Sequence, residues 1–164
     1  MFSTVSGATS YELIYGIAES GEIAKLTESR YFGEIGKRYF DLSELTKGSY
    51  TLRLLAKGGD YEESDLTEPI SYVKKEKLSS PTNIEYDNAD KILSFSSIWN
   101  SFSVVAYYEG SDLTKVITIE DSNENHVLDL TMYLTDNVYK LEIIALGSDN
   151  TYTINSDKVI WQNA

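Results

Sequence analysis

The chain has 164 residues, 13 tyrosines, no cysteine and a formal net charge of −12. Without cysteine, a disulfide framework, a thiolate zinc site and a cysteine nucleophile are all excluded. The acidic balance disfavours nucleic acid and anionic lipid as partners. The sequence lacks an apolar run long enough to enter a membrane, and its first residues lack the basic and apolar regions of a secretory signal, so neither is expected in this chain.

Apolar and polar residues alternate with a period of two along most of the chain. The clearest cases run from Tyr50 to Ala56 and from Tyr139 to Ala145. This period is typical of half-buried strands in antiparallel sheets. Further strands are predicted, in chain order, at 11–17, 23–27, 36–40, 69–74, 83–87, 91–97, 102–109, 115–120, 126–130 and 158–162. Turn-forming clusters separate them and no long segment has a helical period, which favours an all-β fold of antiparallel sandwiches.

The chain also repeats itself. Residues 41–57 (DLSELTKGSYTLRLLAK) match residues 129–146 (DLTMYLTDNVYKLEIIAL), about 89 positions further on. The alignment ends with Ile70–Tyr72 over Val159–Trp161, so Trp161 takes the place of Tyr72. The copies keep their apolar pattern and differ at most surface positions, which indicates two copies of one scaffold.

Two domains are therefore expected, 1–76 and 77–164, joined by a polar, lysine-rich linker near 74–80. The charge is uneven between them, at −4 through Glu76 and −8 in the remainder. Such surfaces suit solubility, cation binding or a basic partner.

Short packing motifs of the second copy follow one another in a characteristic order. They are Pro81-Thr82-Asn83-Ile84, Ile92-Leu93-Ser94-Phe95-Ser96, Ser101-Phe102-Ser103-Val104, Leu134-x4-Tyr139-x-Leu141, and Ser156 before Val159-Ile160-Trp161. Together they resemble a fibronectin type III domain of the bacterial kind, although phenylalanine replaces the tryptophan usual on strand B. The resemblance implies that Pro81 opens strand A, that Phe95 lies in the core, and that Leu134 with Tyr139 forms the corner before strand F.

The first copy fits the same pattern only from strand B onward. Residues 2–11 resemble strand B running into strand C, and Leu45-x4-Tyr50 resembles the corner. The first copy has no counterpart of residues 81–87, so its strand A is not recognisable and a neighbouring strand would present an unpaired edge. Two interpretations stay open: a segment of a longer protein or a dispensable strand, or an edge completed by another chain, including self-association.

Residues that could support catalysis lack the context that it needs. His126, the only histidine, is expected to be a solvated surface residue, and no G-x-S-x-G nucleophile elbow occurs. The carboxylates lie on what look like solvated faces and loops, and no glycine-rich phosphate motif is present. We therefore expect no enzyme and no cofactor.

A calcium loop is imitated by the D-x-N-x-N sequence that begins at Asp121. His126 stands where the sharp turn needs glycine, and Met132 stands where a bidentate glutamate should close the shell. An acidic hairpin loop is the preferred interpretation, with no metal. A weak calcium site built from Asp121, Asn123 and Glu124 is the alternative.

Most aromatic residues are expected to be core. Tyr11, Tyr50, Phe95, Phe102 and Tyr139 fall on the inward side of their strands. One member of each of the pairs Tyr31-Phe32 and Tyr39-Phe40 must point outward, which predicts an exposed aromatic patch.

Trp99 departs from that pattern, because it falls in the turn between strands B and C. Tyr107 is expected to face outward. An exposed indole near Asn100 or Tyr107 could stack on a sugar or on a partner side chain, and these three residues are the candidate ligand-binding set. The alternative is that Trp99 covers the end of the sandwich or the interface between the two domains.

The function that this resemblance implies is a non-catalytic structural, protein-interaction or adhesion module of an extracellular, cell-surface or virion protein. The expected partner is a protein or glycan surface. The alternative is a carbohydrate-binding module that uses exposed aromatics.

Overall fold

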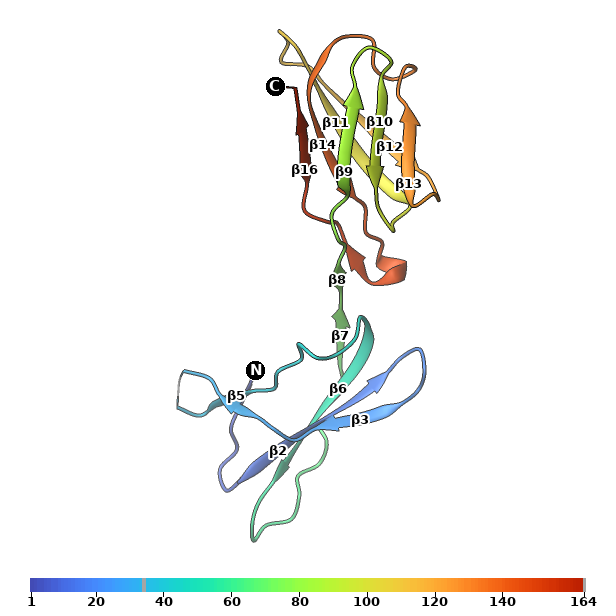
Figure 1. The fold of residues 1–164 in the computed structure, drawn as a ribbon. Helices are drawn as coiled ribbons and strands as arrows, with labels where there is room; N and C mark the ends of the chain where they lie inside the picture. Colours follow the sequence, from blue (N-terminus) through green and yellow to red (C-terminus); the bar gives the residue numbers. More distant parts are fainter. Residues whose placement is uncertain (34, 164) are drawn as a thin grey trace. The chain divides into compact units, whose positions relative to one another are not determined.

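The computed structural model describes residues 1–33 and 35–163, and these form sixteen β-strands and one turn of 3-10 helix (Figure 1). The structure divides into two compact units, Met1–Lys75 (unit 1) and Glu76–Ala164 (unit 2). The predicted all-β fold is confirmed, and each predicted strand is present within two residues of its expected bounds. The two-residue strands β4, β8 and β15 have no strong period and were missed, whereas β1 lies in the segment that the resemblance gave as strand B.

The strands of unit 1 are β1 (Phe2–Ser3), β2 (Ser10–Ile17), β3 (Ile23–Leu26), β4 (Arg30–Tyr31), β5 (Lys37–Tyr39), β6 (Gly48–Lys57) and β7 (Ile70–Lys74). Those of unit 2 are β8 (Glu76–Lys77), β9 (Thr82–Asp87), β10 (Ile92–Ser96), β11 (Ser101–Tyr108), β12 (Thr114–Glu120), β13 (Asn125–Asp129), β14 (Val138–Ala145), β15 (Thr153–Ile154) and β16 (Val159–Gln162). The 3-10 turn η1 spans Asp149–Thr151.

Unit 2 is a sandwich of two antiparallel sheets, ordered β13-β10-β9 and β12-β11-β14-β16. Every second side chain of β10 and β11 points inward, which gives the burial alternation of SFSVVAYY in β11. The inward residues of both sheets form one hydrophobic core, in which Phe95 and Phe102 meet edge to face at 4.8 Å. A short parallel pair, β8 with β15, lies outside these sheets.

Unit 1 has the same plan with sheets ordered β1-β5-β4 and β3-β2-β6-β7. The Phe2 ring of β1 meets Tyr11 of β2 edge to face at 4.8 Å, as Phe95 meets Phe102 in unit 2. Tyr50 donates its hydroxyl to the Thr46 carbonyl at 2.6 Å, which forms the predicted corner before β6. Unit 1 is therefore a second copy of the sandwich.

A serine in each unit makes the same pair of hydrogen bonds to the strand before it. Ser156 donates its backbone N–H to the carbonyl of Ala145 and accepts the Ala145 N–H on Oγ. Ser64 does the same with Ala56. In each unit the serine therefore bonds the backbone N–H and carbonyl of an alanine that the last strand of the sheet does not pair with. The repeat between the units includes this loop contact.

The repeat also preserves a glycine for a steric reason. A Cβ on Gly147 would lie 2.5 Å from the backbone of Ile154, and one on Gly58 would lie 2.9 Å from the Cβ of Tyr61. Neither place can hold a side chain unless the chain shifts, which accounts for Gly58 and Gly147 in the aligned positions.

The sequence alignment of the last strands was wrong by two residues. Leu52 pairs with Ile70 in unit 1, and its counterpart Leu141 pairs with Trp161 in unit 2. Trp161 therefore corresponds to Ile70 and not to Tyr72. The loop before the last strand differs in length between the copies, and a sequence match at constant spacing cannot register that difference.

The prediction that Tyr139 lies in the core was also wrong. Opposite β14, the register shifts between Tyr107 and Tyr108, so that Tyr108 pairs with Val138. This bulge gives the buried place to Val138 and leaves Tyr139 39% exposed. Tyr139 consequently makes no corner of the kind that Tyr50 makes. A bulge of one residue reverses the face on which a side chain points.

Strand A of unit 2 is β9, and unit 1 has no such strand among its described residues. β9 pairs with β10, as expected for the segment after Pro81, whereas β1 pairs only with β5. The described residues contain no helix with the length and hydropathy needed to cross a bilayer.

Candidate protein-interaction face

The outer face of the four-stranded sheet in unit 2 carries a row of apolar side chains around one carboxylate. Val105 of β11 lies opposite Val116 of β12 on one side and opposite Glu142 of β14 on the other. Glu142 in turn lies opposite Ile160 of β16. Val116 is 61% exposed and Ile160 is 52% exposed, so the row crosses all four strands at the surface.

Glu142 is almost buried at the centre of this face, with 9% of its surface exposed. Its Oε1 accepts hydrogen bonds from Lys140 and Lys158, both at 3.1 Å. Burial acts to raise the pKa of the Glu142 carboxyl, but the two lysine hydrogen bonds outweigh it and hold that pKa below its ordinary value. The two lysines clamp Glu142 and therefore keep its carboxylate ionised among the apolar side chains of this row.

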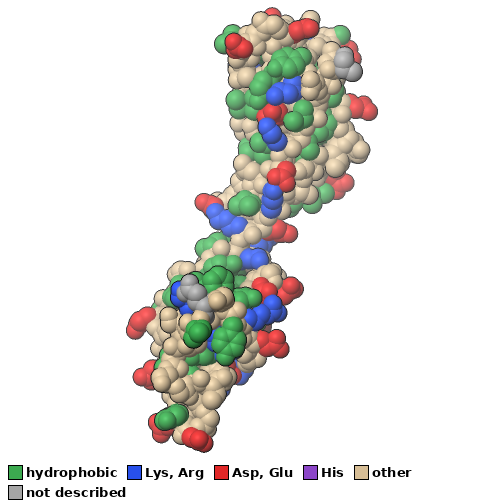
Figure 2. Space-filling model, turned by 90° about the vertical axis from the view of Figure 1, so that its left-hand side faces the viewer, with side chains coloured by type: hydrophobic (Ala, Val, Ile, Leu, Met, Phe, Trp, Pro, Cys, Tyr) green, Lys and Arg blue, Asp and Glu red, His purple; other side chains and the backbone are tan. Residues whose placement is uncertain are grey.

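Two tyrosines extend the face beyond the clamp. The Lys140 ammonium lies 3.6 Å from the centre of the Tyr107 ring, a cation–π contact. Tyr107 and Tyr139 meet edge to face at 6.4 Å. The prediction that Tyr107 points outward is confirmed by this contact, since Lys140 is an outer-face residue. Figure 2 shows hydrophobic side chains gathered around blue and red charged groups on the upper unit.

Trp99 lies in the turn between β10 and β11, where the resemblance places it. Its ring packs against the core, and its Nε1 donates a hydrogen bond to Ser79 at 3.0 Å. Asn100 is exposed beside it. Tyr107 lies near the other end of β11, on the order of 20 Å along the strand from Asn100 at 3.3 Å per residue. The three predicted ligand-binding residues thus form no single platform.

His126 is buried on β13, directly after the acidic loop that follows β12, which corrects the expectation of a solvated His126. His126 is 0% exposed and its ring stacks on Phe95 at 4.7 Å. Its Nδ1 lies 2.9 Å from Oδ2 of Asp121, and that contact is the leading cause that lowers the pKa of the Asp121 carboxyl. β13 turns this residue inward, and the short segment gave no signal of which face it would take.

Two of the three candidate calcium ligands, Asp121 and Asn123, bond to each other. Oδ1 of Asp121 accepts both the backbone N–H and the side-chain amide of Asn123. Glu124 contributes its backbone carbonyl to Ser97 N–H. Across residues 1–33 and 35–163, His, Cys, Asp and Glu form no cluster of three that could hold a metal ion.

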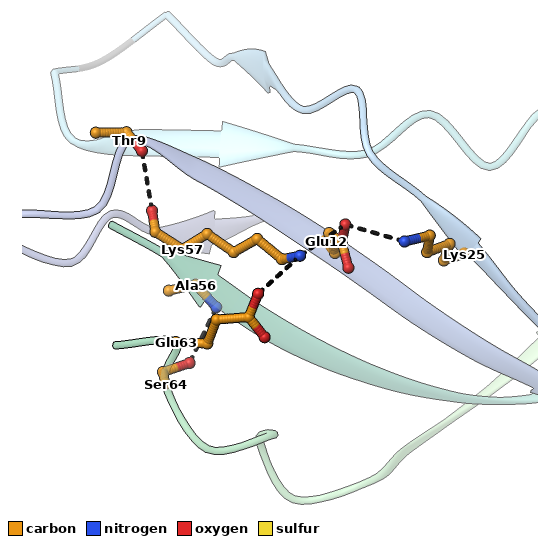
Figure 3. A network of polar contacts seen from close by, with 7 residues as sticks. All are labelled: Thr9, Glu12, Lys25, Ala56, Lys57, Glu63 and Ser64. Atoms are coloured by element: carbon orange, nitrogen blue, oxygen red, sulfur yellow. Dashed lines mark hydrogen bonds and ion pairs between the residues drawn. The ribbon is translucent and has the colours of Figure 1, made fainter. Parts of the chain in front are cut away.

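Unit 1 carries a related lysine–glutamate network on the outer face of its own four-stranded sheet (Figure 3). Glu12 Oε1 lies 3.1 Å from the Lys57 ammonium and 3.2 Å from that of Lys25. The hydrogen bond from Lys57, followed by the one from Lys25, lowers the pKa of the Glu12 carboxyl. Lys57 also bonds Glu63 at 2.9 Å. Both units therefore place one carboxylate between two lysines on the same sheet.

Unit 1 has an exposed aromatic patch, but not with one outward residue from each pair: both Tyr31 and Phe32 are exposed, whereas Tyr39 and Phe40 are half-buried. Tyr31 is 73% exposed and Phe32 is 50% exposed. The Arg38 guanidinium lies 4.4 Å from the centre of the Tyr31 ring, and Phe32 meets Tyr39 edge to face at 6.1 Å. The patch is held in place by these contacts.

The chain resembles solved structures built from fibronectin type III domains. A two-domain fibronectin type III segment of chicken tenascin is 19% identical, with a TM-score of 0.55, and the match covers 98% of this chain and 88% of that one. The chicken interferon gamma receptor alpha chain is 17% identical, with a TM-score of 0.51, over 99% of this chain and 88% of that one.

No protein-family model matches the sequence, and the search of curated proteins found no match. At these identities, the likeness shows the fold: two antiparallel β-sandwiches of fibronectin type III-like topology, the first without a recognisable strand A. Domains of this fold are commonly structural or interaction modules, are generally non-catalytic and are often extracellular.

Proposed function

We propose that this protein is a non-catalytic structural or protein-interaction module of an extracellular, cell-surface or virion protein, of bacterial or phage origin. The observation that carries the proposal is the outer face of unit 2, where Val105, Val116 and Ile160 surround the clamped Glu142. Protein interfaces favour exposed apolar and tyrosine side chains such as these, and the charged groups at the centre of this face are paired with one another. The two lysines leave the clamp with a positive excess, which suits a partner with an acidic rim.

The experiment measures binding of the labelled chain to intact bacterial cells and to purified virions. Val116→Lys with Ile160→Lys adds two charges to the centre of the face and is expected to weaken binding at least about tenfold. Val127→Lys is the matched control, because Val127 is 68% exposed on β13 of the other sheet. Equal binding by the double variant and the unmodified chain would reject this face.

A carbohydrate-binding module is the second candidate, supported by the two outward tyrosines of the same face. A glycan array with Tyr107→Ala and Trp99→Phe tests it. Saccharide binding that is lost in Tyr107→Ala would favour a glycan partner over a protein, and an array without binding would remove this candidate. Trp99→Phe reports whether the indole contributes from its place against the core.

A further inference from the structure

Unit 2 has a hollow at the end of its sandwich that carries the turn between β11 and β12 and the loop between β13 and β14 (Figure 1). Its volume is about 660 Å³, within the range of about 300–1,000 Å³ that small-molecule sites have in proteins. The two segments are joined there, because the backbone N–H of Glu109 donates to the Asn137 carbonyl at 2.9 Å. Hydrogen-bonded backbone therefore fixes one side of the hollow.

Two side chains reach the hollow from the core-facing side of the four-stranded sheet. Tyr108 follows Ala106 by two positions on β11, and Lys115 precedes Ile117 by two positions on β12. Ala106 and Ile117 are buried core residues, so the alternation of the strands turns Tyr108 and Lys115 to the same side. Tyr108 is half-buried and Lys115 is exposed. The sheet therefore extends past the packed core and forms one wall of the hollow.

The corner of unit 1 shows what the same position holds when a tyrosine is present. Tyr50 pairs with Ile17 and is 2% exposed. Its hydroxyl donates to the Thr46 carbonyl at 2.6 Å and lies 3.1 Å from the Thr46 hydroxyl. In unit 2, the same strand position pairs Val138 with Tyr108. A branched aliphatic side chain thus replaces a ring with a hydroxyl.

Unit 2 nevertheless keeps the polar partner of that ring. Thr135 follows Leu134 as Thr46 follows Leu45, and Thr135 lines the hollow. Among the described residues its hydroxyl makes one long hydrogen bond, at 3.4 Å to Oδ2 of Asp136. The corner of unit 2 therefore offers a threonine to a hydroxyl group that its own strand does not supply.

The lining of the hollow combines aromatic rings with polar side chains. Tyr133, which is 49% exposed in the turn after β13, and Tyr108 supply the aromatic surface. The side chains of Glu109 and Lys115 make no hydrogen bond or ion pair within the described part of the chain. Burial, to which the Asp136 carboxylate adds, raises the pKa of the Tyr108 hydroxyl and keeps it a hydrogen-bond donor. Aromatic surface beside unpaired donors and acceptors suits a small polar ring.

We infer that this hollow binds a neutral saccharide, with a pyranose ring packed against Tyr133 and a sugar hydroxyl bonded to Thr135. The C–H face of a pyranose packs on an aromatic ring, and its hydroxyls pair with carboxylates, ammonium groups and other hydroxyls. A phenol would use one such partner, whereas the lining offers several, which favours a polyhydroxylated ring. The carboxylates of Glu109 and Asp136 outnumber the Lys115 ammonium, so the lining disfavours an anionic sugar. The hollow lies at the end of the sandwich, so the inference does not rest on the outer face of the proposed function.

The test titrates the full chain, labelled with nitrogen-15, with the methyl glycosides of glucose, galactose, mannose and N-acetylglucosamine, and follows the backbone amide signals by NMR. We expect at least one of these sugars to shift the signals of residues 109–113 and 135–137, with a dissociation constant on the order of 1 mM for so small a ligand. Glucuronic acid and N-acetylneuraminic acid are the anionic counterparts. They are expected to bind at least about tenfold more weakly, because carboxylates line the hollow.

Two substitutions remove the groups that would contact the sugar. Tyr133→Ala removes the exposed ring and is expected to weaken binding at least about tenfold. Thr135→Val keeps the shape of the side chain and removes its hydroxyl, for an expected loss of about fivefold. Tyr61→Ala is the matched control, because Tyr61 is an exposed tyrosine of unit 1 and is expected to leave sugar binding unchanged.

The proposed function is tested separately, by the binding of Val116→Lys with Ile160→Lys to cells and virions. That double variant changes no residue that lines the hollow. The saccharide site and the outer face can therefore fail independently of each other.

Several outcomes overturn the inference. None of the neutral sugars shifts the signals of residues 109–113 and 135–137, or Tyr133→Ala and Thr135→Val bind them as well as the unmodified chain does. The anionic sugars bind as tightly as the neutral ones. Binding is lost in Tyr107→Ala and kept in Tyr133→Ala, which moves the sugar to the outer face. Free p-cresol shifts these signals and the sugars do not, which assigns the hollow to a tyrosine side chain of a partner protein.

Discussion

His126 stacks on Phe95 with their ring centroids 4.7 Å apart, and Arg38 pairs with Phe2 at the same place in unit 1. Both positions put a nitrogen-bearing side chain at the sandwich interior, beside the first aromatic of strand B. One nitrogen of each, Nε2 of His126 and Nε of Arg38, is buried without a hydrogen-bond partner among the described residues. The repeat thus preserves a polar group within an aromatic cluster.

Truncating His126 is expected to destabilise unit 2 strongly. His126→Ala removes a fully buried ring from between Phe95 and Phe102, and a loss of about 3 kcal/mol is expected, as for other large core rings. His126→Phe keeps the ring and should recover most of that loss. Urea unfolding measures both. A solvated histidine would instead give two nearly silent variants.

The serine contacts predict unequal effects in the two units. Ser156→Ala leaves the buried N–H of Ala145 without a partner, which costs about 2 kcal/mol of unfolding free energy. Ser64→Ala breaks the same bond at an exposed site, where water replaces the hydroxyl, so less than about 1 kcal/mol is expected. Amide exchange at Ala145 and Ala56 reads each bond directly. Equal losses would contradict the difference in burial.

Removing the hydroxyl of Tyr86 is expected to stabilise the protein. Its Oη is buried without a hydrogen-bond partner among the described residues, and burial is the main cause that raises the pKa of Tyr86 to about 12. Tyr86→Phe keeps the edge contact with Trp161 and removes an unsatisfied polar group, for a gain of about 1 kcal/mol. Urea unfolding at neutral pH checks this. A clear loss of stability would show that the hydroxyl has a partner.

The Glu142 clamp gives unit 2 a defined acid sensitivity. Because the pKa of Glu142 is lowered in the folded state, its contribution to stability is fully present above the ordinary value of 4.5 and is lost as pH falls through the lowered pKa. Glu142→Gln should therefore be less stable than the unmodified chain at pH 7, and the difference should shrink below pH 4.5. Thermal unfolding from pH 7 to pH 3 measures it. A difference independent of pH would argue against an ionised clamp.

The sequence predicted the strands well, because each sheet of a sandwich has one solvent-facing and one core-facing side and its strands therefore alternate polar and apolar residues. It failed where a single residue changes register. The bulge between Tyr107 and Tyr108 moves Tyr139 to the surface, and the residue types near the bulge do not indicate that shift of register. The two-residue error in aligning Trp161 with Tyr72 has a different cause, because the loops before the last strands differ in length.

The candidate face could be predicted only in part. Tyr107 was expected to face outward, and the alternation of β11 requires it. The central role of Glu142 depends on Lys158, which is 16 residues away and reaches it from the position just before β16. The inward turn of His126 likewise depends on pairing with Phe95 across the sheet. Contacts between strands are set by tertiary packing, which spacing along the chain does not encode.

The difference in core between the units has a practical consequence for spectroscopy. Both tryptophans of the chain, Trp99 and Trp161, lie in unit 2 and contact its core. Tyr11, Leu13 and Tyr50 are the buried hydrophobic residues described for unit 1. Indole emission therefore follows the melting of unit 2 alone, whereas tyrosine signals at Tyr11 and Tyr50 follow the smaller core. Heating is expected to change the two signals at different temperatures, with tyrosine first.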